Sequence, residues 1–584
     1  MLHCGANLLP DIFKMLLRFR QDEIAIVSDI EKAFLQYKIH PSHRTFLRFF
    51  WAPGVSENPN APIKEFWSTV LDFEIVSSPF IHCAGIKFHI RHLLNKYPEN
   101  AQLLEDIDKH FYMNDLVVSS NTPSEGWQKF NFMINAFESG GFKLKKWATN
   151  NAELGLRIRN HFEGLDAQVC FDSPDFKFLG IGWNQQTDKL EIPTATALRT
   201  MSSNTPSKRK LLQATAQIFD PLGFISPVTI KLKMFLQSLW KQKLTWDAEL
   251  TGENMSKFTE IINMLETAQH IRIQRFLNTA APNATRELHV FCDSSMSALG
   301  CVAYIREFSK QENAIIHFVA SKARVVQIKS EHSIHKLELI GPVLAARIGN
   351  KIRKDLNYHL DRTRYWCDNS PTIHWIKDSP ERWKAFIANR IREIQSLSDP
   401  SDWNYVTSAD ISADLLSRGA SLTAEAARSM WLRGPDWLAQ TGSPSEKHAL
   451  NNLFEKDEFI GSMRKTTCFA VSNSTKIDNS ALDVSRLSSW TILVNSYARI
   501  LRWVKNHKSP TTRVALQKPI STCESLLSTE RIVKLIQKIH FGNELQAQCK
   551  HIAKNSRLFK LSPFIDHEGF IRCRSRLEHS NELS

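Results

Sequence analysis

LHVFCDSSMSALGCVAYI, residues 288–305, is the stretch of sequence that decides the fold of the central part of this chain. Its apolar runs predict two strands, from Leu288 to Cys292 and from Gly300 to Ile305, joined as a hairpin. A third apolar run, Ala314 to Ala320, predicts another strand, and the pattern then continues as helix, strand and helix. Three strands followed by alternating helices and strands indicate a domain that mixes α and β structure.

Four acidic residues follow these predicted elements at a strand end, in a helix, at a second strand end and in a last helix, namely Asp293, Glu338, Asp368 and Asp414. Each carboxylate alone would more often be a solvated surface charge. Together they are the set that hydrolysis of a phosphodiester with two metal ions requires, because both ions need hard oxygen ligands. We therefore expect Mg²⁺, or Mn²⁺, at this site.

A second pair of acids lies nearer the N-terminus, in a region of short apolar strands and helices that indicates α+β structure. Asp29 follows the apolar run from Ile24 to Val27, and Asp115 ends Tyr112-Met-Asn-Asp, just before the run from Leu116 to Val118. These carboxylates can share a metal ion only if the two strands are neighbours in one sheet. Neighbouring strands are therefore part of the prediction.

The remaining segments are helical or irregular. Ser207 to Trp246 is helical and basic and is interrupted by Pro221 and Pro227, which suits a connecting domain better than a catalytic one. The polar segment from Gly419 to Asp478 is irregular apart from the patch Trp431 to Leu438. Ser485 to Lys505 is helical again.

Composition restricts the class of protein. Lys and Arg number 74 against 60 Asp and Glu, a formal charge of +14, so RNA, DNA or an RNA:DNA hybrid is the expected partner. An unspecific basic surface is the alternative. The cysteines form no C-x-x-C pair, and neither a signal peptide nor a membrane-spanning run is recognisable. We expect an intracellular protein, in a cytoplasmic particle or the nucleus, that is not secreted and has no membrane partner.

The N-terminal motifs resemble those of BEL/Pao reverse transcriptases, in the family's order. Asp29 to Gln36 is similar to the first palm motif and Tyr112 to Asp115 to the Y-x-D-D hairpin. The other similar segments are Ser77 to Phe80 (template grip), Gly140 to Trp147 (the next palm motif) and Phe178 to Trp183 (primer grip). Five ordered motifs are hard to obtain by chance, so a purely structural protein is disfavoured.

This resemblance implies roles for individual residues. Asp29 and Asp115 would be catalytic metal ligands, and Phe34 would exclude a ribose 2′-hydroxyl. Tyr112, Met113 and Asn114 would lie at the substrate, a deoxynucleotide if the polymerase is active. Asn114, however, stands where the family has the first aspartate of its pair, and a neutral amide is a weaker ligand. The fingers segment ahead of Asp29 is also expected to be missing, so we expect impaired DNA synthesis.

The central acids lie in segments that resemble the RNase H of BEL/Pao elements, namely Phe291 to Ser294, Lys336 to Leu339, Trp366 to Ser370 and Ala413 to Gly419. The resemblance makes Asp293, Glu338, Asp368 and Asp414 catalytic metal ligands. The segment Ile218 to Phe224 is similar to the family's connection region. No aspartic-protease D-[ST]-G triplet is present, and Trp431 to Leu438 and Leu501 to Val504 are similar to the segment leading into the integrase.

The expected architecture is α+β and α/β multidomain. Its parts are a truncated reverse-transcriptase palm (1–190), a helical thumb or connection (191–280), an RNase H-like domain (285–420), a linker (421–480) and a helical C-terminal segment that leads into an integrase (481–584). The expected function is that of a retroelement Pol fragment with Mg²⁺-dependent RNase H cleavage of RNA:DNA hybrids and a damaged polymerase. The alternative is an inactive relict or a co-opted nucleic-acid-binding protein.

Overall fold

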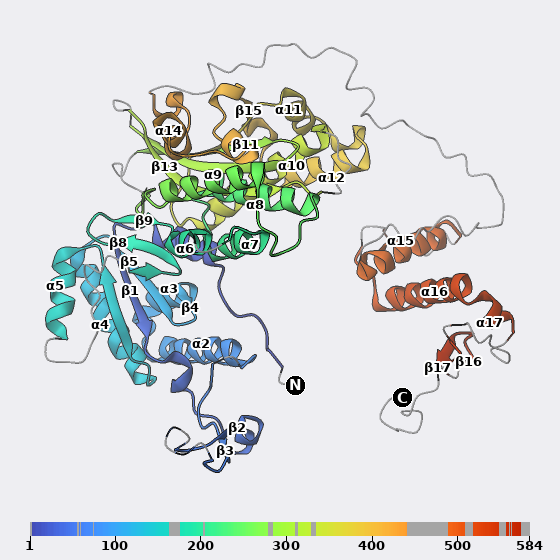
Figure 1. The fold of residues 1–584 in the computed structure, drawn as a ribbon, viewed down its shortest axis with the longest axis horizontal. Coiled ribbons are helices and arrows are strands. Elements are labelled where there is room, and N and C mark those ends of the chain that lie inside the picture. The colour runs from blue at the N-terminus through green and yellow to red at the C-terminus, as the bar shows by residue number, and fades with distance from the viewer. Residues whose placement is uncertain are drawn as a thin grey trace. The chain divides into compact units, whose positions relative to one another are not determined.

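The computed structural model divides into two compact units, Met1–Lys465 and Thr466–Ser584. The described residues are 3–54, 56, 58, 60–73, 75–162, 176–202, 205–277, 284–309, 313–328, 334–440, 489–508, 515, 518–547, 556, 558–559, 561 and 563–573. Residues 441–480 of the predicted linker therefore lie outside the described residues. The mixed α+β multidomain architecture expected from the sequence is confirmed (Figure 1).

An antiparallel sheet forms the first part of the larger unit, with strand order β4-β5-β1-β6 (Figure 1). Its strands are β1 (Ile24–Ile30), β4 (Phe111–Tyr112), β5 (Asp115–Ser120) and β6 (Leu144–Thr149). Successive side chains of a strand point to opposite faces. Ile26 accordingly packs in a core on one face, whereas Val27 joins a separate core on the other. Asp29 shares the face of Val27.

Helices cover the Ile26 face of this sheet, namely α2 (Ser78–Lys96), α3 (Ala101–Lys109), α4 (Pro123–Ser139) and α5 (Ala152–His161). Thr122 and Asn151 start α4 and α5 as N-caps, because their side-chain oxygens accept hydrogen bonds from the amides of Glu125 and Leu154. A hairpin of β2 (Arg48–Trp51) and β3 (Lys64–Trp67) extends from this region with both strands exposed.

A small sheet and a group of helices follow. The sheet has the order β10-β9-β8-β7, with β7 (Lys177–Phe178), β8 (Ile181–Asn184), β9 (Lys189–Glu191) and β10 (Ile273–Gln274). The helices are α6 (Ala195–Ser202), α7 (Lys208–Gln217), α8 (Ser226–Lys241) and α9 (Gly252–Ala268). The predicted break at the prolines separates α7 from α8, and Pro227 lies in the first turn of α8, where its missing N–H costs no hydrogen bond.

A five-stranded sheet with the order β13-β12-β11-β14-β15 forms the rest of the larger unit. Its strands are β11 (Thr285–Ser294), β12 (Ala298–Phe308), β13 (Ile315–Val325), β14 (Arg362–Cys367) and β15 (Trp403–Tyr405). The associated helices are α10 (Ile334–Asp355), α11 (Ser370–Lys377), α12 (Ala385–Leu397), α13 (Asp414–Ser417) and α14 (Glu425–Arg433). The first two strands form the predicted hairpin, the third continues the antiparallel pairing, and the last two join in parallel. The first three strands are longer than the apolar runs that predicted them, because backbone hydrogen bonding between strands continues past the last apolar side chain.

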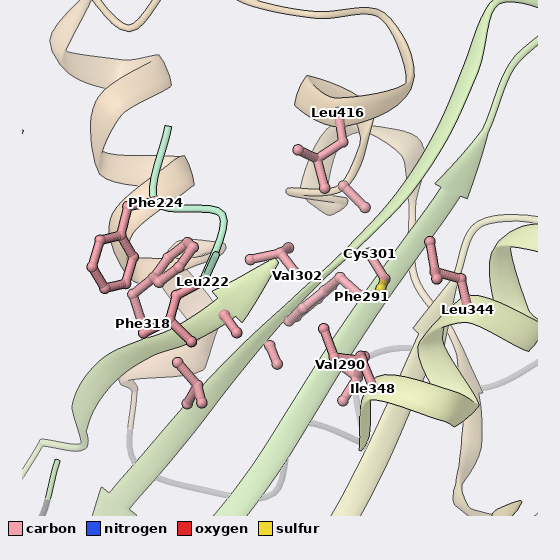
Figure 2. Close-up of a cluster of buried hydrophobic side chains, with 14 of the residues drawn as sticks. Leu222, Phe224, Val290, Phe291, Cys301, Val302, Phe318, Leu344, Ile348 and Leu416 are labelled. Atoms are coloured by element: carbon pink, nitrogen blue, oxygen red, sulfur yellow. The ribbon is translucent and has the colours of Figure 1, made fainter. Parts of the chain in front are cut away.

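The core of this sheet is shared with neighbouring elements. Figure 2 shows Val290 of β11 facing Leu344 and Ile348 of α10. The ring of Phe224, from the loop before α8, packs 5.8 Å from that of Phe318 in β13 (Figure 2). The same buried cluster continues into the face of the first sheet that carries Val27. The hydrophobic core therefore crosses the predicted boundaries near residues 190 and 280.

Residues 425–439, which the sequence analysis placed in a linker, pack against this core. Trp431 of α14 is fully buried, and its Nε1 donates a hydrogen bond to the carbonyl of Phe224 at 2.8 Å. Leu438, in a short 3-10 turn, is also fully buried. The buried residues of this segment are large apolar side chains at irregular spacing, so the sequence showed no helical pattern here.

Two buried arginines connect the three parts of the larger unit. Arg20 follows α1 (Ile12–Phe19), and its guanidinium donates to the carbonyls of Phe318 and Val319 in β13, each at 2.7 Å. It also donates to the carbonyls of Gln274 and Arg275. The pairing of β12 with β13 shifts between Ala303 and Tyr304, so β13 has a bulge at these carbonyls. Arg20 therefore satisfies acceptors that the sheet leaves free.

Arg275 makes the reciprocal contacts. Its guanidinium forms a 2.7 Å ion pair with Asp188 and donates to the carbonyls of Phe19, Asp22 and Glu23. The side chain is fully buried. A buried charge with a carboxylate and several carbonyl partners is satisfied, whereas the loss of any one partner is costly.

The smaller unit contains α15 (Trp490–Lys508), α16 (Thr522–His540), α17 (Gly542–Gln546) and a hairpin of β16 (Pro563–Ile565) and β17 (Ile571–Cys573). Arg502 of α15 forms a two-pronged ion pair with Glu524 of α16, and Glu524 also closes a capping box with Ser521. Across the ranges that the structure describes, no helix has the length and apolar character needed to cross a membrane.

Candidate functional site

The first pair of predicted acids meets in the four-stranded sheet. Strands β1 and β5 are antiparallel neighbours, and Asp29 and Asp115 are register partners directly across from each other. The predicted neighbouring strands are thus observed. Both carboxylates lie on the sheet face opposite α2 to α5, because they share the alternation of Val27 and Val117.

Asn114 contacts Asp29 directly. Its Nδ2 donates a short hydrogen bond to Asp29 Oδ2, and its backbone carbonyl accepts from the amide of Ile30 at 2.9 Å. Lys146 Nζ lies 3.5 Å from the same Asp29 oxygen. Lys146 has a φ of 54° beside an irregularity in the β1–β6 pairing, so a bulge brings it to the carboxylate. The Asn114 amide and the Lys146 ammonium therefore both contact the carboxylate of Asp29.

The electrostatics of this pair are unequal. Burial, reinforced by the negative charge of Asp29, raises the pKa of Asp115 to about 6. Burial also raises the pKa of Asp29, but Lys146 and the amide of Asn114 oppose the rise. Lys146 opposes the rise at Asp115 as well, but Asp115 has no hydrogen bond from Asn114, so it is the less compensated carboxylate and would gain most from an added cation.

Two of the predicted substrate residues, Phe34 and Met113, contact a histidine, His82, that the sequence did not suggest. Met113 has a φ of 53° at the turn between β4 and β5, and its carbonyl accepts a 2.6 Å hydrogen bond from His82 Nε2. The His82 ring lies edge-on to Phe34 with centroids 5.5 Å apart. Tyr112 pairs with Asp115 across the hairpin. His82 is fully buried in α2, and a lone histidine on a helix gave no signal of this role.

The second set of acids gathers at the ends of the central strands of the larger sheet. Cys292 of β11 and Cys367 of β14 are partners in parallel register, so Asp293 and Asp368, one residue further along each strand, lie side by side. Asp414 opens α13. Leu416 of that helix covers Gly300, the register partner of Asp293, and a Cβ at Gly300 would lie 2.5 Å from Leu416 Cβ. The glycine thus admits α13 to the site.

Each of these three carboxylates has a local partner. Ser417 Oγ donates a short hydrogen bond to Asp293 Oδ2, and Ser408 Oγ donates to Asp368 Oδ2 at 2.9 Å. Arg418 Nε lies 2.6 Å from Asp414 Oδ1. Ser417 and Arg418 belong to the Ala413 to Gly419 motif, whereas the sequence held no signal for Ser408.

The carboxylates also repel one another. Burial, followed by the charges of Asp293 and Asp414, raises the pKa of Asp368 to about 6 although Ser408 opposes the rise. The pKa of Asp414 is raised by burial and by Asp293, against the opposing charge of Arg418. The three side chains therefore share one electrostatic environment with an excess of negative charge.

Glu338 reaches this end of the sheet on α10. A Cβ on Gly341 would come within 2.4 Å of Ser294 Oγ and 3.3 Å of the Asp293 carbonyl. The absence of that atom lets α10 lie against the end of β11. Glu338 is half-buried one turn earlier on the same helix. Pro342 lies inside α10, which nevertheless continues to Asp355.

The donor types suit a hard divalent cation, since Mg²⁺ prefers carboxylate oxygens. Within the part of the chain that the structure describes, no group of three or more Asp, Glu, His or Cys side chains is already arranged around one point as a metal site. Arg418 contacts Asp414, Ser417 contacts Asp293 and Ser408 contacts Asp368, so each carboxylate has a separate partner. Arg418 would compete with a bound cation for the carboxylate of Asp414.

Comparison with known proteins gives a family for the central region. Residues 207–369 match the family described as the Pao retrotransposon-like RNaseH-like domain, and the match includes Asp293, Glu338 and Asp368. It begins at α7, so the helices before the sheet belong to the matched region. The comparison with curated proteins finds no match.

Solved structures give distant likenesses. A foamy viral protease-reverse transcriptase in complex with double-stranded DNA has 15% identity and a TM-score of 0.43, over 70% of this chain and 60% of that chain. The foamy viral protease-reverse transcriptase in complex with an RNA/DNA hybrid has 15% identity and a TM-score of 0.41, over 68% of this chain and 46% of the other. The chain thus spans less than two thirds of either, and these scores are too low to assign an activity.

The family match, the strand order of the larger sheet and the acids at its central strand ends agree with one another. Residues 207–369 of this chain therefore carry a region that matches the Pao retrotransposon-like RNaseH-like domain.

Proposed function

We propose that this chain hydrolyses the RNA strand of RNA:DNA hybrids at Asp293, Glu338, Asp368 and Asp414, with Mg²⁺ or Mn²⁺ as the cofactor. The observation that carries the proposal is the juxtaposition of Asp293 and Asp368 on parallel neighbouring strands, with Asp414 near enough to raise the pKa of Asp368. Carboxylates that repel one another in this way create a site that a divalent cation stabilises.

Each residue of the site would have a separate role in the reaction. Asp293 and Asp368 would supply the central cation ligands, with Glu338 and Asp414 on either side. Ser417 and Ser408 orient the two central carboxylates through their hydroxyls. Arg418 would release Asp414 and then contact the nucleic-acid phosphates. Bound Mg²⁺ would supply an activated water and neutralise charge on the scissile phosphate.

The four-stranded sheet supports a second part of the proposal, a reverse-transcriptase palm with impaired synthesis. Asp29 and Asp115 would be its metal ligands, Phe34 its ribose-selecting side chain, and a deoxynucleotide and a primed template its substrates. The hydrogen bond from Asn114 to Asp29 supports impairment, because an amide donor faces the oxygen that a cation would need. The parts would be the palm (1–190), the thumb or connection (191–280), the RNase H-like domain (285–420) and an integrase leader (481–584).

An inactive nucleic-acid-binding relict is the second candidate. The ion pair of Arg418 with Asp414, together with the contacts of Asn114 and Lys146 with Asp29, favours it. These contacts satisfy one carboxylate in each site without any added ion. A relict of this kind would bind hybrids through its basic surface but would not cut them.

The deciding experiment is cleavage of an end-labelled RNA:DNA hybrid by the purified chain in Mg²⁺ or Mn²⁺. We expect RNA fragments from the parent chain and none from Asp293→Asn, which retains the shape of the residue but removes its charge. Asp361→Asn, an exposed acid near the start of β14, is the matched control and should cut normally. Hybrid binding without cleavage by the parent would overturn the nuclease and favour the relict.

A further inference from the structure

A small polar cavity lies where α8, the loop before it and strand β13 meet. Its volume is about 90 Å³, well above the roughly 10–15 Å³ that a single water requires. The cavity is lined by hydroxyls and charged groups, which include those of Asp220, Ser226, Thr229, Lys233, Ser321 and Lys322. None of these residues belongs to either acidic site.

Helical spacing explains how α8 forms one wall. Ser226, Thr229 and Lys233 are separated by three and four residues, so they lie on one face of the helix. Strand β13 forms the opposite wall. Ser321 holds the loop in place, because its amide donates to the carbonyl of Leu222 at 2.8 Å and its hydroxyl to that of Gly223 at 2.6 Å. The two walls are therefore fixed with respect to each other.

Two lysines at this cavity form no ion pair with a described carboxylate. Among the described residues, neither Lys233 nor Lys322 has a carboxylate within 4.0 Å. Partial desolvation and the positive charge of Lys322 lower the pKa of Lys233, and the negative charge of Asp220 only partly opposes this effect. An anion between them would relieve this repulsion.

Asp220 is not the anion that bridges the two lysines. Its two carboxylate oxygens accept hydrogen bonds from the amides of Phe224 and Ile225, at 2.8 and 2.9 Å. It is therefore used in shaping the loop at the start of α8. Burial raises the pKa of Asp220 to about 6, although the amide hydrogen bonds and the charge of Lys233 oppose the rise, so the carboxylate stays mostly ionised near neutral pH.

The cavity is close to the RNaseH-like acids. Helix α13, which carries Asp414, packs against α8, and the amide of Ala420 donates to the carbonyl of Pro227 at 3.2 Å. Across the sheet, Ala323 in the cavity wall is the register partner of Gly300, which is in turn the partner of Asp293. A nucleic-acid strand bound at the acids would thus pass within reach of Lys233 and Lys322.

We propose that Lys233 and Lys322 bind one backbone phosphate of the nucleic-acid substrate, at a site built jointly by α8 and β13. This inference rests on the proposed function, because it assigns a substrate contact to that activity. Ser226 provides a hydroxyl beside the lysines, whereas the hydroxyl of Thr229 donates to the carbonyl of Ser226 at 3.3 Å. The contact reads no base, so it anchors the strand without sequence preference.

The test measures hybrid binding by the full chain in EDTA, as a function of salt, for Lys233→Gln, Lys322→Gln and the double variant. Each phosphate contact contributes roughly 1 to the slope of log Kobs against log salt concentration. We expect the double variant to lose about 1 from that slope and to bind at least several-fold more weakly. Lys241→Gln, an exposed lysine at the far end of α8, is the matched control and should keep the parental slope.

Two further measurements distinguish a lost phosphate contact from disturbed folding and from binding of the free anion. Lys233→Arg and Lys322→Arg preserve the charge and should keep most of the slope, which separates lost charge from disturbed folding. Inorganic phosphate alone should not protect the parent chain against thermal unfolding more than it protects the double variant. If it does, the cavity is a site for the free anion, and the backbone assignment is overturned.

The outcomes separate this inference from the proposed nuclease. An unchanged slope in the double variant, or an equal loss in Lys241→Gln, overturns the phosphate site even if the chain cuts hybrids. A parent chain that does not bind hybrids at all also overturns it. A reduced slope with no cleavage by the parent supports the phosphate site and rejects the nuclease.

Discussion

At the scale of single residues, the first site depends on Asn114. An amide that donates to Asp29 fixes this carboxylate but adds no negative charge, and Lys146 further reduces the charge that a cation would meet. Asp115 remains as the carboxylate with an elevated pKa of about 6. The chemistry of the pair is therefore set by a residue whose backbone position is compatible with either Asn or Asp.

Restoring the acid should restore affinity for a cation. We expect Asn114→Asp to bind Mn²⁺ at the four-stranded sheet about tenfold more tightly than Asn114→Ala, a difference of about 1.4 kcal/mol, because a third carboxylate joins Asp29 and Asp115. Paramagnetic relaxation or calorimetric titration of both variants, each also carrying Asp293→Asn, measures the difference. Equal affinities would mean that Lys146 alone keeps cations away.

Glu287 gives a residue-scale prediction about acid stability. It lies at the opposite end of β11 from Asp293 and contacts His289, Arg306 and Arg364. Burial alone would raise its pKa, but the hydrogen bond with His289 and the surrounding positive charges lower the pKa to about 2. Its folded value is thus below its ordinary 4.5, so its stabilisation is complete above about pH 4.5 and is lost as the pH falls toward 2.

Glu287→Gln should therefore lower the free energy of unfolding at neutral pH by about 3 kcal/mol, because two buried guanidinium groups lose their anion. The variant should also lose much of the pH dependence between pH 4.5 and 2. Denaturant unfolding at several pH values measures both effects. A variant that keeps the parental pH dependence would show that other acids account for the acid sensitivity of the fold.

At the scale of elements, Arg20 joins α1 to the outer strand of another sheet. Its four carbonyl partners lie in β10, in the residue after it and at the bulge of β13. Burial, the largest influence, lowers the pKa of Arg20 to about 9, which still leaves it charged at neutral pH. Because β13 is an edge strand, this contact also covers backbone groups that would otherwise be open to pairing.

Arg20→Met should destabilise the larger unit by at least about 4 kcal/mol, since it leaves several buried carbonyls without donors. Arg18→Met is a matched control two positions earlier in the same region. Among the residues that the structure describes, the Nε and Nη1 atoms of Arg18 have no hydrogen-bond partner, so the loss of Arg18 should cost little. The urea midpoints of the two variants should differ clearly. Similar midpoints would show that packing, and not the buried hydrogen bonds, holds α1 against β13.

At the scale of the whole molecule, the larger unit has one continuous core. The cluster that contains Val27 and Phe19 also contains Phe318 and Trp431. The residues expected to form separate domains therefore bury parts of one another. The observed compact unit extends from the first sheet through α14.

A fragment limited to residues 285–440 should consequently fail to form a stable fold. It would expose the bulge carbonyls of β13 and lose Leu222, Phe224 and Phe19 from the core. A fragment of residues 3–440 should remain folded. Near-UV circular dichroism and amide exchange distinguish the two, and a cooperatively folded short fragment would show that the sheet is independent of the first residues of the chain.

How much of this could be predicted depends on the range of the interaction. The apolar runs beside Asp29 and Asp115 predicted strands, and the condition that both acids share a metal ion made neighbouring strands part of the prediction, as the register shows them to be. The strand order around Asp293 was also predictable, because three strands followed by a helix and a parallel strand leave few topologies. The roles of the individual site residues stay predictions.

The sequence by itself determined the element types, the strands that carry the acids and the basic character of the chain, because periodicity and charge are local properties. Only the tertiary structure decided that Lys146 meets Asp29, that Ser408 meets Asp368 and that Arg20 reaches Val319, 299 residues away. Such contacts depend on bulges, helix docking and the burial of specific groups. Those features arise when distant elements pack together, so no pattern within a short stretch of sequence encodes them.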